Sequence, residues 1–138
     1  MSLTVLVDTN VLMVALSPRS NLHPLYEKFI HGDFRVVVSN EIMLEYEEQL
    51  SRRYGADVVT EFLLIFSEAP NVLRVEPFYK WNLIQQDPDD NKFVDCAIAS
   101  AADYIITHDR HFDVVKQIDF PAVNVITAFE FLRKFGTE

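Results

Sequence analysis

Five short runs of valine, isoleucine and leucine restrict most strongly what this chain can fold into. Runs of this length with almost no polar residue are typical of strands buried on both faces of a parallel sheet. The stretches between them have the apolar spacing and end signals of helices. This alternation predicts an α/β/α layered fold with right-handed connections. The expected strands are Leu3–Asp8, Arg35–Ser39, Val72–Glu76, Asp103–Asp109 and Ala122–Ile126.

The length and composition favour one folded domain. With 138 residues, of which 49% are hydrophobic and 24% charged, the chain has a globular balance and can bury a sizeable core. It contains no internal repeat and no Gly/Ser-rich linker, so we expect a single domain over residues 1–138. The expected helices cover residues 10–16, 21–32, 39–55, 56–69, 90–102, 109–118 and 127–136.

The cysteine content and the start of the chain bear on localisation. Cys96 is the single cysteine, which excludes an internal disulfide and argues against a structural zinc cluster. The first residues lack a basic start, and no run approaches the roughly 18 apolar residues of a membrane helix. We therefore expect a cytoplasmic protein with no membrane association.

The net charge restricts the possible ligands. A formal net charge of -9 and a pI near 4.8 mean that the surface as a whole should repel nucleic acid and anionic membranes. A nucleic-acid ligand would need bound divalent cations, a basic partner protein, or a local basic patch. Such a patch would contain Arg52, Arg53, Lys80 and Lys92.

Acidic residues follow the expected strands. Asp8 ends the first apolar run, Asp109 follows the fourth, and the second run leads into the helix that carries Glu45. Ligands of open parallel sheets bind outside the carboxyl ends of the strands, so we expect these carboxylates at one functional edge. Each also has a structural explanation, because either aspartate can cap the following helix and Glu45 can belong to a solvated acidic face.

The segment DPDDNKFVDC, residues 87–96, contains four aspartates. The last of them, Asp95, begins a small apolar helix face, where its carboxylate would be partly buried and would need a partner. That partner is either a set of backbone amides or a cation. Asp113, four residues after Asp109, adds another carboxylate.

Several carboxylates at one sheet edge coexist at neutral pH only if they are protonated or bound to cations. Because there is no cysteine–histidine cluster, hard cations with oxygen ligands, Mg²⁺ or Mn²⁺, are favoured. His108 and His111 flank Asp109 and are further candidates as ligands or bases, although a histidine in a polar loop is more often a surface residue.

Four segments, in this order, resemble the PIN domain: VLVDTNVL, SNEIMLEYEEQL, DPDDNKFVDCAIASAADYIITHDRHF and VNVITAFEFL. The resemblance extends over essentially the whole chain and is strongest to toxins of bacterial toxin–antitoxin systems, relatives of VapC-like ribonucleases. It implies an α/β/α sandwich with a five-stranded parallel sheet. It also implies metal-dependent endonuclease activity on RNA.

The resemblance further implies site residues. Asp8, Glu45 and Asp109 correspond to catalytic acids and metal ligands, and Asn10 and Thr107 to supporting polar groups.

The third acid departs from the usual PIN pattern, because Asn91 occupies its position. We expect Asp95, one helical turn later and facing the same way, to replace it as catalytic residue and metal ligand, with Asp90 as second choice. Asn91 and Asp113 would then have supporting roles.

The implied reaction is hydrolysis of an RNA phosphodiester bond by water that one or two Mg²⁺ or Mn²⁺ ions activate. A small antitoxin protein and a second copy of the chain are the implied partners. Two alternatives remain: a PIN domain that binds RNA or a protein without cutting, and a nuclease acting on DNA. A response-regulator-like domain fits less well, because no lysine stands at the end of a late strand.

Overall fold

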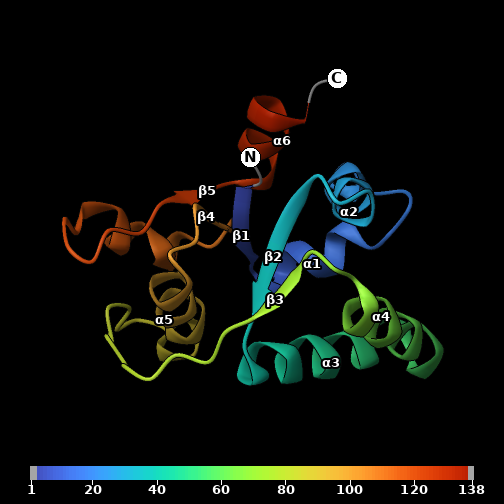
Figure 1. Ribbon diagram of the computed structural model, residues 1–138, viewed down its shortest axis with the longest axis horizontal. Helices are drawn as coiled ribbons and strands as arrows, with labels where there is room; N and C mark the ends of the chain where they lie inside the picture. The colour runs from blue at the N-terminus through green and yellow to red at the C-terminus, as the bar shows by residue number, and fades with distance from the viewer. Residues whose placement is uncertain (1–2, 137–138) are drawn as a thin grey trace.

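All five expected strands form one parallel sheet in the computed structural model, which describes residues 3–136. The strand order is β3-β2-β1-β4-β5, so the chain begins in the middle of the sheet and crosses back over it after β3 (Figure 1). Every pairing is parallel, which places all carboxyl ends at one edge. The strands are β1 (Leu3–Val7), β2 (Phe34–Val38), β3 (Val72–Arg74), β4 (Tyr104–Ile106) and β5 (Val125–Ile126).

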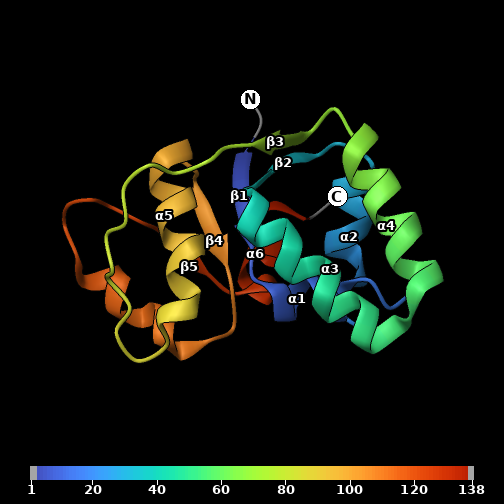
Figure 2. The ribbon, with the colours of Figure 1, turned by 90° about the horizontal axis from the view of Figure 1, so that it is seen from below.

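Helices cover both faces of the sheet and complete three layers. The helices before β3 lie on one side, whereas α5 and the 3₁₀ helix η2, which follow it, lie on the other (Figures 1 and 2). This division follows from right-handed crossovers, because the chain reverses its direction across the sheet after β3. The helices are α1 (Thr9–Ala15), α2 (His23–Ile30), α3 (Asn40–Tyr54), α4 (Ala56–Glu68), η1 (Pro88–Asp90), α5 (Asn91–Ser100), η2 (Arg110–Gln117) and α6 (Ala128–Phe135).

The central strands are buried on both faces, as their apolar sequences predicted. Val5 and Leu6 of β1 and Ile105 and Ile106 of β4 are 0% exposed. Aromatic side chains fill the layer beneath α3 and α4. The predicted α/β/α sandwich with a five-stranded parallel sheet is therefore confirmed. Within the described part of the chain, no helix is both long and apolar enough to cross a membrane.

Two segments matter for the site. Residues 110–117 form a 3₁₀ helix, so the helix expected over 109–118 is present with a tighter winding. Residues 75–87 contain neither helix nor strand, and their backbone lies along α5, where Trp81 and Ile84 bond to side chains of that helix.

Candidate active site

An open cavity of about 440 Å³ lies at the carboxyl edge of the sheet, where β1 and β4 end. In the view onto this edge, α3 and α5 stand on opposite sides of the strand ends (Figure 2). Among the described residues of its lining, eight are acidic and Lys92 is the one basic residue. The acidic residues are Asp8, Glu41, Glu45, Glu48, Asp87, Asp89, Asp90 and Asp109.

Thr107 links two of these acids. Its hydroxyl donates to Oδ2 of Asp8 at 2.7 Å and accepts a bond from the backbone N–H of Asp109 at 3.0 Å. The threonine of the T-x-D motif, Thr107, thus places its hydroxyl between the two aspartates that follow β1 and β4. The side chain of Asp8 makes no capping bond to α1, so helix capping does not explain this residue.

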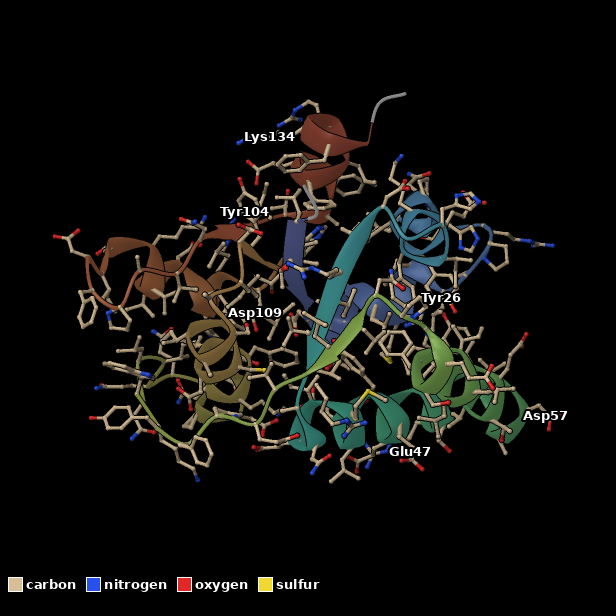
Figure 3. The ribbon with its side chains drawn as sticks, in the orientation of Figure 1. Tyr26, Glu47, Asp57, Tyr104, Asp109 and Lys134 are labelled. Carbon is tan, nitrogen blue, oxygen red and sulfur yellow. The ribbon has the colours of Figure 1, made fainter. Side chains whose placement is uncertain are left out.

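Asp109 has two roles. Its Oδ1 accepts the backbone N–H of His111 at 2.9 Å and thereby caps η2, and its side chain also lines the cavity. Figure 3 places Asp109 in the interior of the view, beside α5, whereas Glu47 of α3 extends away from the molecule. The two explanations that the sequence allowed for Asp109 are thus compatible.

The opposite wall of the cavity carries Glu45, which α3 supplies. The Thr9 hydroxyl donates to Oε2 of Glu45, and the ammonium of Lys92 pairs with Oε1. Lys92 also contacts the carbonyl oxygen of Asp89 at 2.9 Å and its Oδ1 at 3.1 Å. Burial lowers the pKa of Lys92, but the bonds to Glu45 and Asp89 outweigh burial and leave the pKa raised, so the ammonium stays charged.

Asp90, at the end of η1, faces other carboxylates. One ligand atom from each of Asp87, Asp90, Asp109 and His111 lies within 4.8 Å of the others. Oδ2 of Asp90 is buried, and no hydrogen-bond partner for it exists among the described residues. Burial, followed by the charges of Asp8, Asp87 and Asp109, raises the pKa of Asp90 to about 8.

Asp8 shares this environment. Burial raises its pKa to about 6; the Thr107 bond opposes this shift, and the nearby charges of Asp109 and Glu45 add to it. The pKa values of two carboxyl groups of one cavity are thus raised, first by burial and then by the charges of neighbouring acids. A set of carboxylates with one imidazole suits Mg²⁺ or Mn²⁺, so the residues fit the implied cation.

Asp95 does not line this cavity. Its Oδ1 accepts the backbone N–H of Trp81 at 3.1 Å, which was the structural explanation open to it. Asn91, one turn earlier, bonds with both the N–H and the carbonyl of Ile84, at 2.9 Å each. Asp95 therefore does face the same way as Asn91, but this face of α5 holds residues 81–84, and the carboxylate that reaches the cavity belongs to Asp90.

The remaining predicted residues divide between the cavity and other places. Asn10 is exposed and lines the cavity. Asp113 is exposed and pairs with Lys116 at 3.3 Å, away from the lining. His108 accepts the backbone N–H of Ala128 through Nε2 at 3.0 Å, a structural bond at the start of α6.

Sequence reasoning missed the position of Lys92. It was grouped with surface arginines and Lys80 as a basic patch, but its side chain is 5% exposed and lies inside the acidic cavity. The signal was present, because Lys92 is the one basic residue within the acidic segment 87–96. Sequence reasoning also missed Thr9, whose hydroxyl bonds to Glu45.

Fold and cavity together define an α/β domain that can hold divalent cations at the edge of a parallel sheet. A family model described as a PIN domain matches residues 4–111, and the chain belongs to this family. No match was found among curated protein sequences.

Solved structures share the fold at low sequence identity. VapBC2 from Rickettsia felis, bound to a DNA fragment from its promoter, has a TM-score of 0.63 at 16% identity, over 91% of this chain and 98% of that chain. FitAcB from Neisseria gonorrhoeae has a TM-score of 0.56 at 16% identity with the same two coverages. The RRP44 PIN domain of T. brucei has a TM-score of 0.53 at 12% identity, over 96% of this chain and 80% of that chain.

Proposed function

We propose that this protein is a metal-dependent endoribonuclease and the toxin component of a toxin–antitoxin pair. The observation that carries the proposal is the convergence of Asp8, Glu45, Asp90 and Asp109, from four separate segments, on one open cavity. Membership of the PIN family supports nuclease chemistry at this place.

In this proposal Asp8, Asp90 and Asp109 hold the cation, and Asp87 and His111 lie near enough to contribute. When bound, Mg²⁺ or Mn²⁺ supplies a water of lowered pKa and offsets the charge that develops on the scissile phosphate. Thr107 fixes the carboxylate of Asp8 relative to Asp109. The proposal replaces the expected third acid, Asp95, by Asp90, because Asp95 bonds to backbone outside the cavity.

The proposed partners follow the structural neighbours. The fold shared with VapBC2, together with the resemblance of the sequence to toxins of toxin–antitoxin systems, supports a small antitoxin protein as partner of this chain. We also propose that residues 1–138 act as one domain in the cytoplasm, as a homodimer.

The test is cleavage of a labelled single-stranded RNA beside a DNA strand of matched sequence. Wild type should cut the RNA with Mn²⁺ or Mg²⁺ and not with EDTA, and Asp8→Asn should lose this activity. Asp57→Asn, which removes an acid from the first turn of α4 outside the cavity, is the matched control and should cut like wild type. Faster cutting of DNA would assign the DNA nuclease alternative. Equal background from wild type and Asp8→Asn would replace the proposal by a PIN domain that binds without cutting.

A further inference from the structure

We propose that Lys92 is a positioning residue whose ammonium compensates the charge of Glu45. The site then binds one divalent ion, held by Asp8, Asp90 and Asp109, and Glu45 does not coordinate it directly. This inference rests on the proposed function and specifies the metal content of the same cavity.

The contacts of Lys92 carry the first step. An ammonium group has three N–H donors, and the Nζ atom of Lys92 has three acceptors around it: Oε1 of Glu45, Oδ1 of Asp89 and the carbonyl oxygen of Asp89. Because the side chain is 5% exposed, little water competes for these positions. The ammonium is therefore held in place by α3 on one side and by η1 on the other.

The contacts of Glu45 carry the second step. Its two carboxylate oxygens each have a protein donor, Lys92 for Oε1 and the Thr9 hydroxyl for Oε2. The ammonium already compensates the charge of this carboxylate, and the Thr9 hydroxyl donates a further hydrogen bond to it, so Glu45 has less need of a metal ion than an uncompensated acid. A metal ion bound directly by Glu45 would lie close to the ammonium of Lys92, and the repulsion between the two cations disfavours this arrangement.

The other side of the cavity differs. Asp90 has a buried oxygen without a hydrogen-bond partner among the described residues, no lysine or arginine of that part of the chain pairs with Asp8, Asp90 or Asp109, and the basic group nearby is the imidazole of His111, 3.3 Å from Oδ1 of Asp109. The negative charge that needs a divalent cation is therefore concentrated on this side. The ammonium of Lys92 then compensates the carboxylates of Glu45 and Asp89, and one divalent ion compensates those of Asp8, Asp90 and Asp109.

A purely structural ion pair would not have this placement. Burying a lysine–glutamate pair is costly, so the pair is weak evidence for a stabilising role. Here the pair lies in the lining of the cavity, and its acid comes from the helix that faces the other site acids. The position favours a function in arranging the site.

The experiment is calorimetric titration of the protein with Mn²⁺ alone, without RNA. The variants are Lys92→Met, Lys92→Arg, Glu45→Gln and Asp90→Asn. Lys116→Met is the matched control, because Lys116 also pairs with an aspartate three residues earlier, at 3.3 Å, but on the surface. Circular dichroism establishes that each variant is folded, and the comparison of Glu45→Gln with Asp90→Asn keeps the test usable if Lys92→Met does not fold.

Wild type, Lys92→Arg and Lys116→Met should bind one Mn²⁺ per chain, and Lys92→Met should bind a second ion between Glu45 and Asp89. Glu45→Gln should lower the affinity for the first ion by no more than roughly 10–100-fold, the usual effect of changing a residue that only supports a metal ligand. Asp90→Asn should lower this affinity more. Two ions in wild type, or equal losses in Glu45→Gln and Asp90→Asn, would overturn the inference while leaving metal-dependent cleavage intact. No Mn²⁺ binding at all would overturn the proposed function as well.

Discussion

Asp90 and Asp95 stand five residues apart, one just before α5 and one in its middle, yet their surroundings differ. Burial raises the pKa of both carboxyl groups. For Asp90 the next causes are three further aspartates, which raise the pKa again. For Asp95 they are the N–H of Trp81 and the charge of Lys80, which lower it, and after them the charge of Glu41, which raises it.

The difference teaches that burial alone does not mark a functional acid. Asp95 is about as buried as Asp8, at 6% and 5% exposure, but its carboxylate has a hydrogen bond and a nearby cation. Asp90 is less buried, and the groups nearest to it include the carboxylates of Asp87 and Asp109, the latter as a hydrogen-bond partner that raises its pKa. An acid whose neighbours are other acids is the stronger candidate for binding a cation.

The largest expected effect separates the two residues by activity. Asp90→Asn should lower kcat/KM for RNA cleavage by at least about 10²-fold, because it removes a charge that holds the cation. Asp95→Asn should stay within a few-fold of wild type, because its amide oxygen can still accept the Trp81 N–H. Steady-state cleavage at saturating Mn²⁺ measures both. The opposite ranking would restore Asp95 as the third acid.

A smaller effect concerns stability and pH in metal-free protein. The pKa of Asp8 is raised to about 6 and that of Asp90 to about 8, from 3.8 in both cases. The folded form then keeps protons that the unfolded chain releases, so this stabilisation is present below about pH 4 and is lost as the pH rises through about 8. The melting temperature in EDTA should therefore fall from about pH 5 to about pH 8.

The same titration sharpens the comparison. In Asp90→Asn the melting temperature should fall less between about pH 6 and about pH 8. The variant should be equally or more stable than wild type at pH 8, because repulsion among the acids is relieved. In Asp95→Asn the melting temperature should fall over this pH range as it does in wild type. A melting temperature that rises with pH in wild type would contradict the assignment of uncompensated charge to Asp90.

The smallest expected effect is structural. Asp95→Ala should lower the free energy of unfolding by about 1 kcal/mol, because the N–H of Trp81 loses its acceptor. Urea denaturation in EDTA measures this loss, and Asp95→Asn, which keeps an acceptor, is the control. Cleavage well below the melting temperature should not change. A loss of cleavage in Asp95→Ala with unchanged stability would place Asp95 in the site.

The fold could be predicted because its determinants are local. Each strand is rich in valine, isoleucine or leucine, and each described strand overlaps the predicted range. The positions of Asp8 and Asp109 followed from the same rule, since the ends of parallel strands share one edge. Glu45 followed from the strand that precedes its helix and from the family resemblance.

The third acid could not be derived in this way. Whether Asn91 faces the cavity depends on residues 75–87, which have no periodic pattern and yet supply the backbone groups that bind Asn91 and Asp95. The burial of Lys92 likewise depends on its contact across the cavity with Glu45, because α5 and α3 are far apart in sequence. A sequence pattern indicates which face of a helix or strand is apolar, but it does not indicate which other segment of the chain packs on that face.

The Thr107 hydroxyl has a consequence for the energetics of binding. It donates a hydrogen bond to the Asp8 carboxylate and accepts one from the backbone N–H of Asp109. These two bonds connect the ends of the neighbouring strands β1 and β4. The conformational entropy of bringing these two acids together is therefore lost when the chain folds, and a ligand that uses them does not lose it again. This side of the cavity is preorganised, so its affinity should depend more on charge than on rearrangement.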